Sequence, residues 1–212
     1  MWKKLFSSNK PIPKRWPFDL RSGAMVEFDS LTFSLLPPDA LFPKINVRQG
    51  VETRGLVDLG AATRLHRFYL NDDTWIQAKS VNGDEDHCVN DLKIFVFYDT
   101  KTPTTEAGLQ ALAGENSPLG LEHYMFEGKN FSRVWGDAEA RAAPVAFDEK
   151  VYANSDTLLE FSTHHHAMLY ERQIADSSKM EYLLVSVEES LGDLSVVFSV
   201  GLDLQSSDFN VT

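Results

Sequence analysis

Apolar residues recur at every second position along much of the chain, a pattern that predicts β-strands. The clearest run lies between residues 157 and 204, where Leu183, Val185 and Val187 follow this period. A period of two sends successive side chains to opposite faces of a pleated sheet. The short links at 176–179 and 191–193 have the length and the residues of hairpin turns. The pattern therefore predicts a three-stranded antiparallel meander that supplies the main buried sheet.

A second meander is predicted in the first half of the chain, over 63–70, 74–81 and 91–98. Polar turns at 71–73 and 82–86 separate its strands. The third strand is apolar on both faces, which favours a central place in a sheet. Further strands are predicted over 24–36, 45–59 and 144–152, and as a hairpin around 127–130. The residues after Leu204 are expected to form a loose tail, with a short edge strand at Phe209 and Val211 as the alternative.

One helix is predicted with clear boundaries, over 104–113. Thr104 or Thr105 can cap its start, and Gly114 can end it. The fold class expected from these elements is β-rich α+β, mostly antiparallel sheet with a single clear helix. The order of elements allows two similar halves, 22–103 and 118–212, joined by this helix, although no residue-level repeat relates them.

The first 21 residues differ from the rest and are expected to form an arm on a single β-rich body at 22–212. Apolar side chains at i, i+3 and i+4 share one face of a helical turn, with lysines off that face. A linker with two prolines, at 7–13, cannot continue such a helix. The arm residues expected to contact a membrane or a partner are Trp2, Lys3, Lys4, Leu5, Phe6 and Lys10.

The charge of the chain is distributed unevenly between arm and body. The net charge is -11, yet residues 1–21 hold six basic side chains against one acidic one, and the remainder holds 14 against 30. A basic, aromatic arm fits an anionic lipid surface, where apolar side chains insert and lysines meet headgroups. The alternative is an arm that folds back on the acidic body or frays, since six residues are too few for a stable isolated helix.

Several functional classes are disfavoured by composition. Cys88 is the single cysteine, so no internal disulfide can form, and a reducing cytoplasm is the expected location. The sequence lacks an apolar run near the ~20 residues of a spanning helix, and its start lacks a secretory h-region. An acidic body disfavours nucleic-acid binding. Neither a phosphate-binding glycine loop nor a G-x-S-x-G nucleophile motif is present.

The cluster His164-His165-His166 is the most distinct candidate for metal chemistry. On a strand, His164 and His166 point to the same face, as two ligands of one ion would. Glu171 follows five residues after His166, so the spacing H-x-H-x4-E resembles the first half-motif of cupin metal sites. The glycines of that half-motif and the whole second half-motif are missing. The alternative interpretation is a solvated strand face.

A second group, the acidic loop 84–88 with Asp91 nearby, offers oxygen ligands of the kind that Ca²⁺ or Mg²⁺ prefers. It lacks the glycine and the closing glutamate of an EF-hand loop. A solvated turn between two strands explains it better.

Several stretches along the whole chain are similar to the uncharacterised bacterial YjfK-like family. They are MWKKLF, AMVEFDSL, GLVDLGAATRLHRFYLNDDTWIQ, LKIFVFYDT, RVWG and PVAFDEKVY. The resemblance implies no established activity and supplies no catalytic residues. It implies an accessory role at the inner membrane face, beside a phage-shock-protein-A-like membrane-stress protein.

The function expected from the sequence is therefore that of a non-enzymatic cytoplasmic accessory protein. It would bind a protein partner, an anionic inner-membrane surface or both, without a cofactor and without nucleic acid. The alternative is a metal-binding protein or metal-dependent enzyme with a divalent ion at His164, His166 and Glu171. A third hypothesis is a structural subunit that pairs with copies of itself through exposed strand edges.

Overall fold

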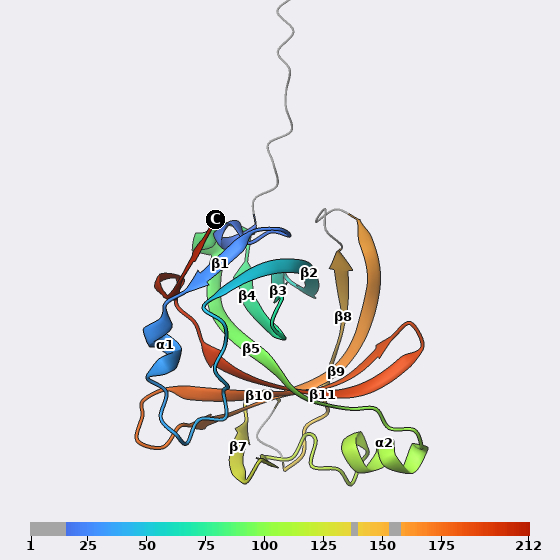
Figure 1. Ribbon diagram of the computed structural model, residues 1–212. Helices are drawn as coiled ribbons and strands as arrows, with labels where there is room; N and C mark the ends of the chain where they lie inside the picture. The colour runs from blue at the N-terminus through green and yellow to red at the C-terminus, as the bar shows by residue number, and fades with distance from the viewer. Residues whose placement is uncertain (1–15, 137–139, 153–157) are drawn as a thin grey trace, which may run out of the picture.

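A computed structural model describes residues 16–136, 140–152 and 158–212 (Figure 1). Its strands are β1 (Met25–Phe28), β2 (Arg48–Gly60), β3 (Thr63–Leu70), β4 (Thr74–Val81), β5 (Val89–Lys101), β6 (His123–Phe126), β7 (Lys129–Arg133), β8 (Val145–Tyr152), β9 (Leu159–Gln173), β10 (Met180–Ser190), β11 (Asp193–Asp203) and β12 (Phe209–Val211). The helices are α1 (Ser30–Ser34) and α2 (Glu106–Ala113), with 3-10 turns η1 (Pro17–Asp19), η2 (Asp86–Cys88) and η3 (Ser206–Asp208).

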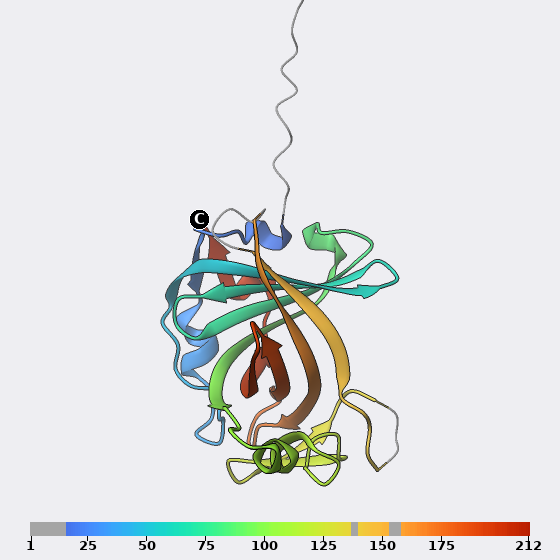
Figure 2. The same ribbon diagram turned by 90° about the vertical axis from the view of Figure 1, so that its right-hand side faces the viewer.

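Eight of these strands close into a ring. The sheet runs β2-β3-β4-β5-β11-β10-β9, and β8 pairs with both β9 and β2, which completes the circuit. Every pairing is antiparallel. Figure 1 views this barrel-like arrangement partly end-on, and Figure 2 views it from the side. Closure pairs most of the strand edges that an open sheet of this size would expose, and among the described residues the first half of β8 keeps one unpaired edge.

The two predicted meanders form the two sides of the ring. The first is β3-β4-β5 and the second is β9-β10-β11, as the period of two indicated. The expectation that β5 is central is confirmed, since β5 lies between β4 and β11 and joins the two meanders. The fold class, an antiparallel β-rich α+β protein with one clear helix, is confirmed as well.

Each ring strand has an inner and an outer face, and on several strands, such as β3, β4 and β10, both faces are largely buried. The inner face holds one apolar cluster, made of Val57, Leu65, Trp75, Phe95, Phe147, Ala167, Leu169, Tyr182 and Leu184. The outer face of the same strands contributes to a second, larger cluster that includes Phe68, Ile76 and Ile94. Two buried faces explain why several strands read as continuous apolar runs.

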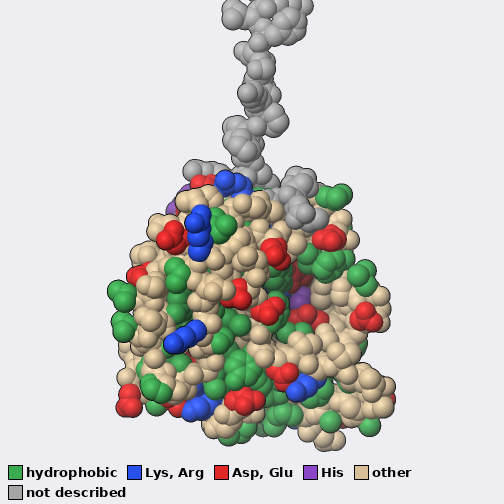
Figure 3. Space-filling model, viewed as in Figure 1, with side chains coloured by type: hydrophobic (Ala, Val, Ile, Leu, Met, Phe, Trp, Pro, Cys, Tyr) green, Lys and Arg blue, Asp and Glu red, His purple; other side chains and the backbone are tan. Residues whose placement is uncertain are grey.

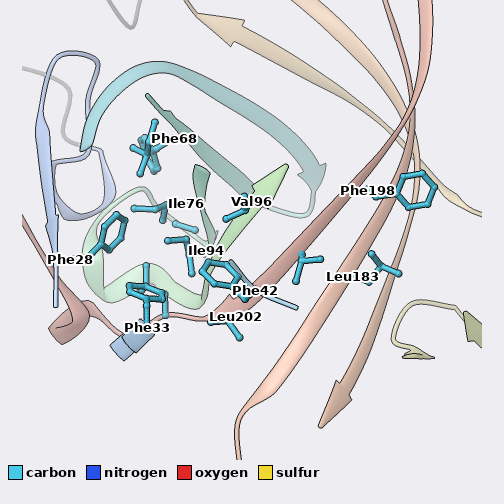
Figure 4. Close-up of a cluster of buried hydrophobic side chains, with 14 of the residues drawn as sticks. Phe28, Phe33, Phe42, Phe68, Ile76, Ile94, Val96, Leu183, Phe198 and Leu202 are labelled. Carbon is cyan, nitrogen blue, oxygen red and sulfur yellow. The ribbon is translucent and has the colours of Figure 1, made fainter. Parts of the chain in front are cut away.

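The outer face of β3, β4 and β5 is covered by the N-terminal part of the described chain and by the C-terminal strand. β12 pairs with β1, and β1 pairs with β2, so both ends of the described chain extend the sheet beyond the ring. Figure 4 shows Phe28, Phe33 and Phe42 packed toward Phe68, Ile76 and Ile94 on this side. This layer seals one flank of the ring.

A second layer covers the outer face of β9, β10 and β11. The β6–β7 hairpin joins the sheet through β7, which pairs with β9. Tyr124, Phe126 and Phe131 pack there on outward residues of the ring strands, such as Phe198. Figures 1 and 2 both show α2 and this hairpin below the ring.

The helix expected at 104–113 is observed as α2, with the Thr105 side chain accepting a hydrogen bond from the Gly108 amide. The strand expected through 24–36 is wrong in its second half, because it stops at Phe28 and a short helix, α1, follows. The Asp29 carboxylate accepts a hydrogen bond from the Leu31 amide, and this cap starts the helix. The last part of the expected arm also belongs to the body, since Trp16 and Leu20 are buried in the outer cluster.

Within the described residues, no helix is long and apolar enough to cross a membrane.

Candidate functional site

The inner face of the ring carries charged side chains in the middle of its apolar cluster. Arg67 on β3 and Glu149 on β8 are 3% and 1% exposed, and Arg67 Nη1 donates to Glu149 Oε2 at 2.6 Å. The two strands do not neighbour each other, so the ion pair spans the interior past β2. Removing either partner would leave an uncompensated charge away from water, so the two groups stabilise each other.

Glu149 receives two further contacts. The Tyr69 hydroxyl donates to Glu149 Oε1 at 2.7 Å, and His165 Nε2 lies 3.1 Å from Oε2. Burial alone would raise the pKa of Glu149, but the Arg67 guanidinium, together with His165 and Tyr69, lowers that pKa from 4.5 to about 2. Glu149 is thus an ionised carboxylate enclosed by donors.

His165 links the network to β10. Its Nδ1 lies 3.0 Å from the Ser186 hydroxyl and 3.5 Å from Glu188 Oε1. Burial opposes a charge on His165, yet its hydrogen bonds with Glu149 and Glu188 raise its pKa above 6.5. Figure 3 shows a hollow on this face of the molecule, with acidic and histidine side chains in its walls. Polar groups therefore line part of the ring.

The guanidinium of Arg67 lies between two aromatic rings. Its Cζ is 4.8 Å from the centroid of Trp75 and 5.4 Å from that of Phe147. Its Nε donates to Gln77 Oε1 at 3.3 Å, and its Nη1 is bound to Glu149. Among the described residues, Arg67 Nη2 and Trp75 Nε1 are buried without a hydrogen-bond partner. The guanidinium of Arg67 and the indole of Trp75 therefore each have one hydrogen-bond donor without an acceptor in the described chain.

A cavity of about 260 Å³ lies inside one end of the ring, next to Arg67. Its lining is mostly apolar, with two charged residues at the rim; the residues are Leu59, Leu65, Gln77, Lys79, Asp91, Trp135, Val145, Phe147 and Leu169. Gln77 and Phe147 line this cavity and also contact the Arg67 guanidinium. Nε and Nη2 project from the same edge of a guanidinium, so the unpaired Nη2 lies beside the Gln77 contact.

The ring is incomplete next to this cavity. β2 and β8 share a ladder of four pairs, from Arg54–Tyr152 to Val57–Glu149, and the first half of β8 pairs with β9 alone. An outer cleft of about 660 Å³ occupies the separation between the two strands. Cleft and cavity share Leu59, Val145 and Phe147 in their linings. The separated strands therefore provide an entrance.

The two charged residues of the cavity lining, Asp91 and Lys79, differ in whether they form an ion pair. Asp91 accepts from Lys93 Nζ at 2.6 Å, and Lys93 also contacts Asp203 at 2.8 Å. No ion pair is found for Lys79 within the described part of the chain. Lys79 is therefore a cation in the cavity lining for which the described residues provide no ion pair.

The structure brings together two of the three predicted metal ligands. His164 and His166 lie on the outer face of β9, with their Nε2 atoms 3.1 Å apart. Glu171 is an odd number of residues away on the same regular strand, so it lies on the opposite face, about 16 Å along β9. Asp148 on β8 contacts the pair instead, since its Oδ1 lies 2.7 Å from His164 Nδ1.

The other predicted sites are placed as follows. The arm residues Trp2, Lys3, Lys4, Leu5, Phe6 and Lys10 lie outside the described residues. In the acidic loop, Asp84 pairs with Arg64 and Asp86 accepts from the Phe18 amide, so both carboxylates serve structural contacts.

The Arg67–Glu149 pair was not predicted, although the sequence carries a signal for it. Arg67 stands between Leu65 and Tyr69 at positions of one strand face, and Glu149 stands between Phe147 and Val151 in the same way. A charge whose same-face neighbours are apolar is expected to be buried and paired. The partner of each charge is over 80 residues away and cannot be read from the pattern.

Comparison with known proteins supports one family. The family model described as "Protein of unknown function (DUF2491)" matches residues 1–210. The chain is 26% identical over 195 residues to the uncharacterized protein YjfK of Escherichia coli (strain K12), which covers 91% of this chain and 87% of that protein. No solved structure matches. The resemblance expected from the sequence motifs is confirmed.

Proposed function

This chain belongs to the DUF2491 family of proteins of unknown function, and on that premise we propose that it is a non-enzymatic binding protein. Its ligand is a small molecule with an apolar body and an anionic end, held inside the ring. One observation carries the proposal: the cavity of about 260 Å³ is lined by Gln77 and Phe147, which contact the Arg67 guanidinium, and Arg67 Nη2 has no acceptor in the described chain.

The chemistry of the ligand follows from what the site lacks. Arg67 Nη2 and Trp75 Nε1 are donors, and Lys79 adds a cation at the rim. A buried donor without a partner costs about 1–3 kcal/mol, so a ligand that supplies acceptor oxygens is favoured. A carboxylate suits a guanidinium in particular, because its two oxygens can accept parallel hydrogen bonds.

The size of the ligand follows from the volume. A cavity of about 150 Å³ in another protein holds one benzene molecule. In proportion, 260 Å³ accepts roughly ten non-hydrogen atoms. Octanoate has this size, and its chain would contact Leu65, Phe147 and Leu169. Burial of such a chain stabilises a complex by about 0.8 kcal/mol per methylene group.

The test compares three head groups on one chain length. Octanoate, octan-1-ol and octylammonium are titrated into the full-length protein at pH 7 and low salt, with tryptophan fluorescence as the readout, since Trp135 lines the cavity and Trp75 adjoins Arg67. The expected order of affinity is octanoate, then octanol, then octylammonium, with at least tenfold between the first and the last.

Two outcomes would contradict the proposal. If none of the three binds below millimolar concentration, the cavity is only a packing feature. If octylammonium binds as tightly as octanoate, the donors do not select the head group. Acyl chains of four and twelve carbons serve as size controls and are expected to bind more weakly than eight.

Peripheral attachment to an anionic inner membrane or to a partner protein, from a cytoplasmic location, is a separate proposal. It is supported by the uneven charge, with six basic residues against one acidic residue in 1–21 and a strongly acidic remainder. Flotation with anionic liposomes tests it, comparing the full chain with one that begins at Trp16, which keeps the buried Trp16 and Leu20. Flotation of the full chain alone, weakened by salt, is the expected result. Equal behaviour of the two chains contradicts it.

A further inference from the structure

We propose that His164 and His166 form a binding site for one divalent transition-metal ion of the Zn²⁺ or Cu²⁺ class. The two residues alternate with His165 along β9, so they share its outer face while His165 points into the ring. Their rings meet edge to face at 77°, with the two Nε2 atoms 3.1 Å apart. The site is therefore separated from the interior cavity by the thickness of the strand.

The separation of the two nitrogens suits shared coordination. Histidine nitrogens bind Zn²⁺ at about 2.0–2.1 Å. Two such ligands are then about 2.8–3.0 Å apart at right-angled positions and about 3.3–3.4 Å apart at tetrahedral positions. The observed 3.1 Å lies between these two values, at an N–metal–N angle of roughly 100°. Imidazole ligands favour Zn²⁺ and Cu²⁺ over Ca²⁺ or Mg²⁺, which prefer oxygen.

Asp148 orients the first of the two ligands. Its Oδ1 lies 2.7 Å from His164 Nδ1, so that nitrogen carries the proton and Nε2 keeps its lone pair. A carboxylate behind a metal-binding histidine fixes the tautomer and increases the basicity of the ligand. Asp148 is therefore a positioning residue for this site.

The site is open on its solvent side. Both histidines are exposed, and within the described residues no group of three or more His, Cys, Asp or Glu side chains surrounds a metal position. Water or an external ligand would complete the coordination. Glu189 faces His164 from the neighbouring strand β10, and the acidic body favours a cation here. A moderate affinity is expected, because two protein ligands are fewer than a closed structural site provides.

The competing interpretation is a hydrogen-bond chain without metal. In that chain Asp148 accepts a hydrogen bond from His164, and His164 accepts one from His166. A Zn²⁺ titration distinguishes the two interpretations, because a site that serves only as a hydrogen-bond chain is not expected to bind the ion. Zn²⁺ is titrated into the untagged full-length protein at pH 7.5 in competition with a chromophoric chelator. The variants are His164→Gln and His166→Gln, with His123→Gln as the matched control, since His123 is an exposed histidine on β6.

The expected result is one Zn²⁺ per chain, with affinity at least tenfold weaker in each of the two variants and unchanged in the control. Asp148→Asn is expected to weaken binding by tenfold or more without changing the metal-free melting temperature, and Asp148→Glu to recover most of it. Three results would overturn the proposal: no Zn²⁺ bound at up to 1 mM, wild-type affinity in His166→Gln, or loss of binding in Cys88→Ser.

Discussion

A side chain at residue 55 cannot coexist with the carboxylate of Glu149. A Cβ placed on Gly55 would overlap Glu149 Oε1 and lie 2.7 Å from its Cδ. Gly55 on β2 lies opposite Arg67 on β3 and opposite Val151 on β8. The missing side chain on the intervening strand is what lets the ion pair cross the interior. Glycine is needed at this position because it leaves room for the Glu149 carboxylate, and not because of its backbone conformation.

Gly55→Ala is therefore expected to lower the free energy of unfolding by about 2–4 kcal/mol, because it expels a buried carboxylate from its partners. Urea denaturation measures the loss. Gly50→Ala on the same strand is the matched control, since no atom lies within 4 Å of its added Cβ. The control is expected to change stability by less than about 1 kcal/mol. Equal losses in the two variants would contradict the role given to Gly55.

Breaking the ion pair from one side should cost more than removing it altogether. Arg67→Met leaves Glu149 charged and buried, so a loss of about 3–5 kcal/mol is expected. Adding Glu149→Gln removes that charge while keeping an acceptor for Tyr69, and should restore part of the stability. Denaturation of the two single variants and the double variant measures this coupling. Additive losses would show that the two groups do not depend on each other.

A matched control tests whether burial is the cause. Arg64, three residues before Arg67 on β3, pairs with Asp84 at 2.9 Å but is 42% exposed. Arg64→Met should therefore cost less than about 1 kcal/mol. A loss as large as that of Arg67→Met would mean that exposure does not distinguish the pairs.

Stability should also depend on pH through His66, which lies on the outer face of β3 beneath Trp16. Burial lowers the pKa of His66 from 6.5 to about 4; Asp84 opposes this shift, while Arg54 and Arg64 add to it. The unfolded chain binds the proton first, so the stability is full above pH 6.5 and falls as the pH decreases toward 4. The loss attributable to His66 is roughly 3 kcal/mol.

The measurement compares urea denaturation of the wild type with that of His66→Gln at several pH values from 7 to 4. Carboxylates titrate in both proteins, so the difference between the two curves isolates His66. The wild-type curve is expected to fall more steeply. Parallel curves would contradict the assigned pKa.

The parts of this structure that a sequence pattern can predict are the local ones. The alternation at Leu183, Val185 and Val187 indicated a strand, and Thr105 indicated the start of α2. The short helix α1 was missed because Asp29 looked like one more polar strand position, whereas its carboxylate caps a helix. An aspartate can cap a helix or occupy a polar strand position, and tertiary contacts decide which of the two it does.

The long-range parts could not be predicted in this way. Alternation states that β2 and β8 exist, but not that a four-pair ladder between them closes the ring and leaves an entrance. For the same reason the sequence predicted Glu171 as the third residue beside His164 and His166. In the structure the pairing of β8 with β9 places Asp148 beside His164 instead. Register between distant strands is set by the folded chain as a whole, so it leaves no mark at either position alone.

The central claim is that the ring interior binds an anionic ligand through the separation of β2 and β8. Isothermal titration calorimetry with octanoate tests it directly on three proteins: the wild type, Val145→Trp and Val47→Trp. Val145 is 39% exposed and lines both the cleft and the cavity, whereas Val47 is 41% exposed on another surface of the molecule. The two variants thus carry the same large side chain at similar exposure.

The account predicts one octanoate per chain for the wild type and for Val47→Trp, and binding at least tenfold weaker for Val145→Trp. Both variants should unfold at similar urea concentrations, because each added ring starts from a partly exposed position. Wild-type affinity in Val145→Trp, or an equal loss in Val47→Trp, would contradict the claim that the ligand enters and occupies the ring.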